Sequence, residues 1–227
     1  MNRLIPDLVV DRLLHVTPED LHALSPETRV VCMDIDGTVT DYHAASVPVE
    51  AQERIRSFTA AGLLTVIVSN CSGARVEEVH RLFDGLVTEV MTPADCVDPT
   101  DPGDSGRRHR KPAPDMLLEA ASRLTVTDPA IGAERAVRPA EMLMIGDQMF
   151  KDVLVARRAG TKAVLLPRLG SHDHLGVRLL QRPVETVLRV LWRLPVRAED
   201  WPGRLAAVGG RPSGAAAGPG AAHGGRR

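Results

Sequence analysis

Two carboxylates separated by a single residue are the first candidates for chemistry in this sequence. Asp34 and Asp36 directly follow the apolar run 30–33 and precede Gly37. A carboxylate in that place can attack phosphorus, and a second one two residues on can protonate a leaving alcohol and later activate water. An acidic pair before glycine is also common in an ordinary turn with a helix cap. The rest of the chain has to decide between these interpretations.

Three further motifs supply the other groups that phosphoryl transfer needs. Ser69 and Asn70 end an apolar run, where a hydroxyl could donate to a transferring phosphoryl oxygen. Lys111, followed by proline, supplies a cation for the charge that nucleophile and phosphate share. Asp147 and Asp152 offer carboxylates for an ion with octahedral oxygen ligands, such as Mg²⁺. Each motif alone is also compatible with a strand-ending turn or a solvated basic loop, but the four in this order favour an active site.

The elements expected to position these residues alternate between strand and helix. Short apolar runs predict buried parallel strands, and patterns of helical period lie between them. Such an alternation predicts an α/β fold, a three-layer doubly wound (Rossmann-like) parallel sheet whose ligands bind at the carboxyl ends of the strands. The predicted strands are 30–33, 63–68, 86–90, 143–145 and 163–166, and the predicted helices lie near 48–61, 73–83, 114–124 and 149–159.

Three kinds of segment surround this alternation. Residues 4–16 have apolar side chains at helical spacing, and Thr17 followed by Pro18 is typical of a second helix start. We therefore expect residues 1–29 to form a helical segment that packs on a catalytic domain of residues 30–195. Stretches rich in Pro, Gly and charged residues predict loops, and the Gly/Ala/Pro-rich C-terminus predicts a disordered tail. The loops are 98–114 and 125–139, and the tail is 196–227.

The spacing of the motifs leaves no room for a large cap domain. About two dozen residues separate Thr38 from the second predicted strand, and a helix takes most of them. The stretch 70–111 holds a helix, a strand and a loop, which falls short of an inserted domain. We therefore expect an open site, which admits a large or membrane-held substrate because no lid has to enclose the leaving group.

Composition excludes several classes of function. The formal net charge of −1 and the sequence pI near 6.7 give no overall basic field, so we expect no nucleic-acid partner. Three cysteines without metal-ligand spacing support neither a disulfide framework nor a zinc site, and a reducing cytoplasm fits best. No apolar run approaches the roughly 20 residues that span a bilayer. Peripheral contact with the inner face of a membrane remains compatible with the sequence.

The segments DIDGT, SN, KP and GDQMFKD together resemble the four signature motifs of the haloacid dehalogenase (HAD) superfamily. The resemblance covers about residues 30–166 and implies a phosphatase with a covalent aspartyl-phosphate. By this resemblance Asp34 is the nucleophile and Asp36 the general acid and base, which Thr38 orients. Ser69 and Lys111, with the neighbouring Asn70, are implied to bind the substrate phosphate.

The same resemblance implies a Mg²⁺ cofactor. Its ligands would be Asp34 and Asp147, joined by the backbone carbonyl of Asp36, and Asp152 would support the metal shell. Transport ATPases of the superfamily resemble this motif with threonine in place of the second acid, and dehalogenases lack that acid. Asp36 therefore favours a phosphatase.

A finer likeness points to the YqeG family of that superfamily. The chain is similar to it in IPDLVVDRLLHVTPEDL, in GDQMFKDVLVARRAG, and in VLLPRLGSHD with the basic, apolar helix that follows, over about residues 4–194. This likeness implies a substrate such as phosphatidylglycerophosphate, a phosphorylated membrane lipid.

The leading hypothesis is therefore a phosphatase for a lipid headgroup phosphate. In residues 183–194 apolar side chains share one side of the predicted helix, and Arg182, Arg189 and Arg193 are available for anionic lipid. The apolar set is Val184, Val187, Leu188, Leu191 and Trp192. The same pattern is equally typical of a helix that packs on the core.

Two other functions compete with it. One is a capless phosphatase for a soluble sugar phosphate, whose site neighbouring subunits would close. The other is a non-catalytic scaffold that binds a protein partner, although a scaffold has no need of Asp34, Asp36, Lys111 and Asp147 together.

Overall fold

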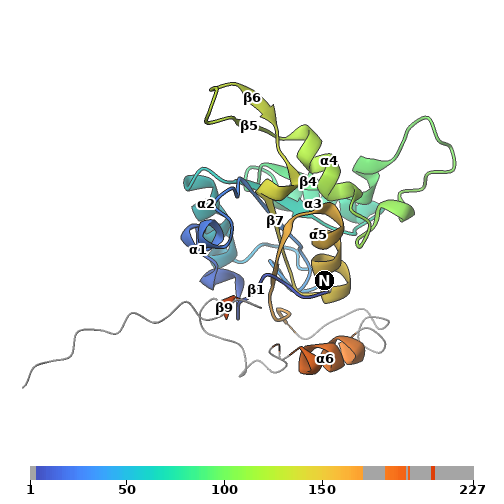
Figure 1. Ribbon diagram of the computed structural model, residues 1–227. Helices are drawn as coiled ribbons and strands as arrows, with labels where there is room; N and C mark the ends of the chain where they lie inside the picture. The colour runs from blue at the N-terminus through green and yellow to red at the C-terminus, as the bar shows by residue number, and fades with distance from the viewer. Residues whose placement is uncertain (1–3, 171–181, 193, 195–205, 208–227) are drawn as a thin grey trace, which may run out of the picture.

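The central feature of the fold is one sheet with helices on both faces (Figure 1). The computed structural model describes residues 4–170, 182–192, 194 and 206–207. Six strands run parallel, and the short seventh, β9, pairs antiparallel with β1. In spatial order the strands are β4 (Glu89–Met91), β3 (Leu64–Val68), β2 (Val30–Met33), β7 (Met142–Gly146), β8 (Lys162–Leu165), β1 (Leu8–Val9) and β9 (Ala206–Ala207).

Alternating side chains of the strands feed two separate cores. In β2, Val30 and Cys32 pack on one face of the sheet, and Val31 and Met33 pack on the other. The first face is covered by α4 (Asp115–Arg123) and α5 (Leu154–Ala159), and the second by α1 (Pro18–Leu24), α2 (Val49–Ala60) and α3 (Ala74–Phe83). The predicted three-layer α/β fold is confirmed.

The N-terminal segment differs from the prediction. Residues 4–16 do not form a helix, because Leu8 and Val9 join the sheet beside β8 and only a 3₁₀ turn, η1 (Leu13–His15), follows. Asp7 secures this strand, since its carboxylate accepts from the backbone N–H of Ala163 at 2.8 Å and contacts Arg157 at 2.9 Å. An open sheet edge thus overrides the helical periodicity. The second helix is as predicted and begins after Thr17, whose side chain caps α1 together with Asp20.

Residues 125–139 also differ from the predicted loop. They form a hairpin of β5 (Thr125–Thr127) and β6 (Glu134–Ala136), which projects from the body (Figure 1), followed by η4 (Pro139–Glu141). Arg135 on β6 reaches back and donates to both carboxylate oxygens of Glu141, at 2.8 and 2.6 Å. This buried carboxylate fixes the hairpin to the start of β7.

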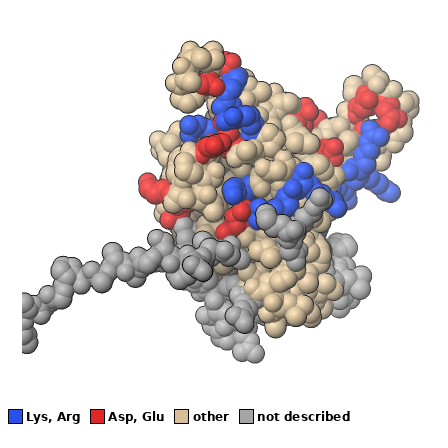
Figure 2. Space-filling model, in the orientation of Figure 1, with Lys and Arg blue, Asp and Glu red and all other residues tan. Residues whose placement is uncertain are grey.

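The loop around residues 98–110 projects at the other side of the molecule, ending in η3 (Arg107–His109), with η2 (Pro93–Cys96) before it. Figure 2 shows acidic and basic side chains next to each other on this loop. Arg108 pairs with Asp101 at 3.2 Å and with Asp104 at 2.8 Å. The side chain of Asp104 is fully buried and also contacts His109 at 2.8 Å. The loop is therefore tied down immediately before Lys111.

The C-terminal helix is α6 (Arg182–Leu191), in agreement with the predicted helix there. The sequence left open whether this helix faces a membrane or packs on the core, and its packing answers part of that question. Leu188 and Trp192 pack against the core and Arg189 is buried, whereas Val187 and Leu191 are 58% and 68% exposed. The expectation that Arg189 faces a lipid surface is therefore wrong. The side chain of Arg182 and the whole of Arg193 lie outside the described residues.

The predicted tail of residues 196–227 also lies outside the described part, except for Ala206 and Ala207, which pair with Val9 and Leu8 in the sheet. Within the described residues, no helix is both long and apolar enough to cross a membrane.

Candidate active site

The carboxyl ends of three adjacent strands bring the predicted site residues to one edge of the sheet. Asp34 follows β2, Ser69 follows β3, and Asp147 follows β7. Because β2 lies between β3 and β7 and pairs in parallel with both, these ends are at the same level. Residues separated by more than a hundred positions in the chain are thus neighbours.

Lys111 enters this edge from the loop before α4 and contacts two carboxylates. Its Nζ lies 2.5 Å from Asp34 Oδ1 and 2.8 Å from Asp152 Oδ1. The Lys111 side chain is only 1% exposed, and those of Asp34 and Asp152 are 11% and 2% exposed. A buried ammonium flanked by buried carboxylates is stabilised only by such pairing, so each partner depends on the others.

The protonation equilibria of these groups reflect that dependence. Burial alone would lower the pKa of Lys111, but the carboxylates of Asp152 and Asp34 raise it well above its usual range, so Lys111 remains a cation. Burial raises the pKa of Asp34 to about 7, opposed by Lys111 and reinforced by the charges of Asp152 and Asp147. The cluster therefore holds more negative charge than one lysine offsets.

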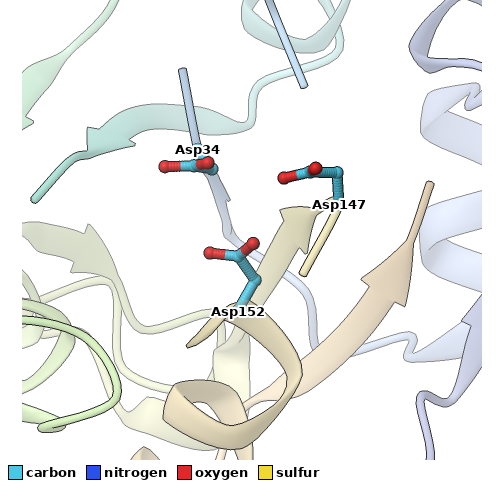
Figure 3. A group of neighbouring side chains, drawn as sticks. All are labelled: Asp34, Asp147 and Asp152. Carbon is cyan, nitrogen blue, oxygen red and sulfur yellow. The ribbon is translucent and has the colours of Figure 1, made fainter. Parts of the chain in front are cut away.

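Three carboxylates of this cluster meet at one point (Figure 3). Ligand oxygens of Asp34, Asp147 and Asp152 lie within 4.8 Å of one another, and all three residues are buried. Asp152 comes from η5 (Met149–Val153), a π-helical turn that carries its carboxylate back over the end of β7. A Cβ on Gly146 would meet Asp152 Cγ at 2.2 Å, so only glycine allows this approach. Hard oxygen donors in this number suit a divalent cation such as Mg²⁺.

The structure places Asn70 at the backbone of Lys111. Asn70 Oδ1 accepts from the backbone N–H of Lys111 at 2.7 Å, and Asn70 Nδ2 donates to the backbone carbonyl of Lys111 at 3.1 Å. Both ends of the amide are therefore engaged, so Asn70 fixes the chain that carries Lys111. Ser69 is buried and lines the pocket, and its Oγ accepts from the backbone N–H of Cys71 at 3.3 Å.

Asp36 is held by contacts with His43 and Arg75. Its Oδ1 accepts from the backbone N–H of His43 at 2.8 Å and lies 3.9 Å from Arg75 Nη2. The side chain of Asp36 is 29% exposed and lines the pocket, where a leaving oxygen can reach it. The Asp36 carboxylate is not part of the cluster formed by the other three aspartates.

Thr38 does not take the place that the sequence predicted. Its hydroxyl is buried and has no hydrogen-bond partner among the described residues, and in particular none with Asp36. Thr38 lines a separate, mostly apolar pocket of about 210 Å³ that also includes Leu14 and Leu166. The backbone of the turn fixes Asp36 instead, through the bond from Gly37 N–H to the Thr40 carbonyl at 2.7 Å.

All these groups open onto one pocket of about 450 Å³. Its wall includes cations that the sequence did not single out, namely Arg75, Arg110 and Lys151, and the neighbouring aromatic rings of Tyr42 and His43. Arg110 stands next to Lys111 in the basic run 107–111, for which a solvated loop was the alternative interpretation. Its position next to Lys111 could have predicted its place in the pocket, because a loop that places Lys111 at the site also places the neighbouring residue close to it.

Residues 108–193 match the model of a family described as HAD-hydrolase-like, a stretch that contains Lys111, Asp147 and Asp152. Over this stretch the chain is similar to the HAD-like hydrolases. A curated relative, the bifunctional riboflavin kinase/FMN phosphatase of Arabidopsis thaliana, is 28% identical over 151 residues, which cover 66% of this chain and 33% of the relative. The chain thus spans about a third of the length of this curated relative.

Two solved structures share a likeness of lower extent. The cobalt-bound deoxy-D-mannose-octulosonate 8-phosphate phosphatase of Haemophilus influenzae is 15% identical, with a TM-score of 0.39 and coverage of 62% of this chain and 68% of that one. The corresponding enzyme of Moraxella catarrhalis, in complex with magnesium ion, phosphate ion and the sugar acid, is 14% identical, with a TM-score of 0.35 and coverage of 54% and 59%.

Proposed function

We propose that the chain is a magnesium-dependent phosphomonoester hydrolase that works through an aspartyl-phosphate on Asp34. The contact between Lys111 and Asp34 at the floor of the pocket carries this proposal. One oxygen of Asp34 is held by a permanent cation, which leaves the other for attack on phosphorus. The name of the Arabidopsis thaliana relative, which includes FMN phosphatase, supports the same class of reaction.

Asp36 is the acid and base of the proposed reaction. In the first step an Asp34 oxygen bonds to phosphorus, the bond from phosphorus to the leaving oxygen breaks, and protonated Asp36 gives that oxygen its proton. In the second step ionised Asp36 takes a proton from water, whose oxygen bonds to phosphorus while the bond to Asp34 breaks. The products are an alcohol and inorganic phosphate, and Asp36 is again protonated.

The metal ligands follow from the cluster of carboxylates. Asp34 and Asp147 would hold Mg²⁺ with the backbone carbonyl of Asp36, and Asp152 would support the metal shell as it supports Lys111. The ion would offset the charge of Asp34 and of the substrate phosphate at close range. The presence of three buried carboxylates beside a single lysine supports this assignment.

The proposed activity can be tested with a generic aryl phosphate in Mg²⁺ and in excess chelator. We expect hydrolysis that requires the metal. Asp34→Asn should fall below a tenth of wild-type kcat/KM, a loss of at least about 1.4 kcal/mol, because an amide cannot form the acyl phosphate. Asp36→Asn should be severely slowed with aryl and alkyl phosphates alike. A wild-type protein without any phosphatase activity would favour a non-catalytic scaffold.

For the substrate we propose a lipid headgroup phosphate, such as that of phosphatidylglycerophosphate, handled at the cytoplasmic face of a membrane, as in the YqeG family. The supporting observation is the exposed apolar side of α6, made of Val184, Val187, Val190 and Leu191. The helix borders the site, because Glu185 Oε1 accepts from the backbone N–H of Phe150, next to the pocket residue Lys151, at 3.3 Å. A membrane that took up this side would therefore lie near the pocket.

A panel of phosphate esters separates this substrate from the alternative. Phosphate release is measured with phosphatidylglycerophosphate in anionic vesicles and with soluble sugar phosphates, under the same Mg²⁺ concentration. The lipid proposal expects the highest kcat/KM with the vesicle substrate and sedimentation of the protein with the vesicles. A preference for a sugar phosphate without vesicle binding would replace it by the soluble phosphatase.

A further inference from the structure

Lys111, a buried cation of the pocket, already has carboxylate partners. Lys111 is bound to Asp34 and Asp152, so its charge belongs to the nucleophile and the metal cluster. Arg75 is likewise engaged, since its Nη1 lies 2.7 Å from Glu78 and its Nη2 is 3.9 Å from Asp36. The charges of both side chains are thus already shared with carboxylates of the protein.

Two other cations of the pocket, Arg110 and Lys151, have no such partner within the described part of the chain. Among the described residues, no carboxylate lies within ion-pair distance of Arg110 or Lys151, although both line the same pocket as Asp34. By contrast, Arg108, two residues before Arg110, is paired with Asp101 and Asp104. Within the described part of the chain, Arg110 and Lys151 are therefore cations without a carboxylate partner that line the pocket together with Asp34.

Arg110 is also held in place. Its Nη2 donates to Ser72 Oγ at 2.8 Å, and the next residue, Lys111, is fixed through its backbone by Asn70. Holding an arginine in one orientation before a ligand arrives reduces the entropy that binding would cost. Ser72 and Arg110 both line the pocket, so this bond holds the guanidinium at the pocket wall.

The geometry points to a subsite for a second phosphate group, carried by the leaving alcohol of the substrate and bound between Arg110 and Lys151. This inference rests on the proposed phosphatase function and specifies its substrate class. A guanidinium offers two parallel donors to phosphate oxygens, and an ammonium adds a point charge from the segment after β7. The second group is a phosphomonoester of a soluble bisphosphate or the phosphodiester of a lipid headgroup, because both present the same anionic oxygens.

The kinetic test compares substrates with one and two phosphate groups. The soluble pair is fructose 6-phosphate and fructose 1,6-bisphosphate, and the lipid pair is phosphatidic acid and phosphatidylglycerophosphate in mixed micelles. Wild-type kcat/KM should be higher for the second member of at least one pair, which identifies the source. Arg110→Gln should reduce that ratio about tenfold, mainly through KM, and Lys151→Gln should do the same. Arg107→Gln, an exposed arginine of the same loop outside the pocket, should leave the ratio unchanged.

A binding measurement keeps the inference testable whatever the activity. Calorimetry gives the affinity of the Asp34→Asn variant for both members of the preferred pair, or of the fructose pair if no hydrolysis is seen. Adding Arg110→Gln should weaken binding of the two-phosphate ligand about tenfold more than that of the one-phosphate ligand. An equal effect on both ligands, or no wild-type discrimination between them, overturns the subsite. If the wild type does not hydrolyse aryl phosphate, the proposed phosphatase function is contradicted instead.

Discussion

The side-chain amide of Asn70 binds both backbone polar groups of Lys111, although 41 residues separate them. Through this pair of hydrogen bonds the end of β3 determines where the ammonium that contacts Asp34 is placed. Asn70, which the sequence predicted to bind the substrate phosphate, thus also holds the backbone of Lys111 in place.

Asn70→Ala should therefore impair catalysis by releasing Lys111. Two hydrogen bonds to buried backbone are lost, which should lower the free energy of unfolding by about 1–3 kcal/mol. We expect kcat for an aryl phosphate to fall at least about tenfold, with a smaller change in KM, because the nucleophile loses its fixed cation. Kinetics and urea unfolding give the two values. Gln52→Ala on α2 is the control and should leave kcat unchanged, since it removes two side-chain bonds, one to the Val47 carbonyl and one from Arg56.

Asp147→Asn should raise the Mg²⁺ concentration needed for half-maximal activity. The variant removes one charge from three carboxylates whose oxygens lie within 4.8 Å of one another. Thermal unfolding with and without Mg²⁺ gives a second readout, because an ion that binds only the folded state raises its melting temperature. We expect the stabilisation by Mg²⁺ in the wild type to be reduced in the variant. An identical shift in both proteins would place the ion elsewhere.

Glu141→Gln should lower stability in a pH-dependent manner. Hydrogen bonds from Arg135 and Arg138 hold the pKa of Glu141 far below its usual value of 4.5. A carboxyl with a depressed pKa in the folded state stabilises the fold above its unfolded pKa, and that stabilisation is lost as pH falls.

The difference in unfolding free energy between wild type and Glu141→Gln should thus be constant above about pH 5, near 2 kcal/mol, and shrink below about pH 4.5. Urea unfolding at several pH values measures it. Glu134→Gln, an exposed position on β6, should show little difference at any of them. A difference that grows on acidification would contradict this role of Glu141.

Replacing Val187 and Leu191 by glutamine should abolish binding to anionic vesicles without affecting aryl phosphate hydrolysis. Both side chains are more than half exposed, so the variant should lose little folding stability. Binding to a membrane would lose the burial of two apolar side chains, each of which contributes about 1.5–3 kcal/mol. Vesicle sedimentation measures the binding. The control is Ile131→Gln in the turn of the hairpin, which removes an equally exposed apolar side chain away from α6. Unchanged sedimentation of the double variant would end the role of this helix in membrane binding.

Local patterns in the sequence determined most of the fold. The apolar run before Asp34 can only be a buried strand, and the period of residues 49–60 places Ile55 and Phe58 on one buried side of α2. Because parallel strands end at a common edge, the order of the motifs also predicted that Asp34, Ser69 and Asp147 would meet. These inferences hold because strand and helix periods and strand-end placement are local or topological properties.

Tertiary structure decided what depends on partners distant in the chain. Leu8 and Val9 became a strand because the edge of β8 was open to them, and residues 125–136 became a hairpin that Arg135 fixes to the buried carboxylate of Glu141. Arg189 turned inward when α6 packed on the core. In each case a contact between distant segments contributes more free energy than the weak local preference of either segment. A pattern within one segment contains no information about such a contact.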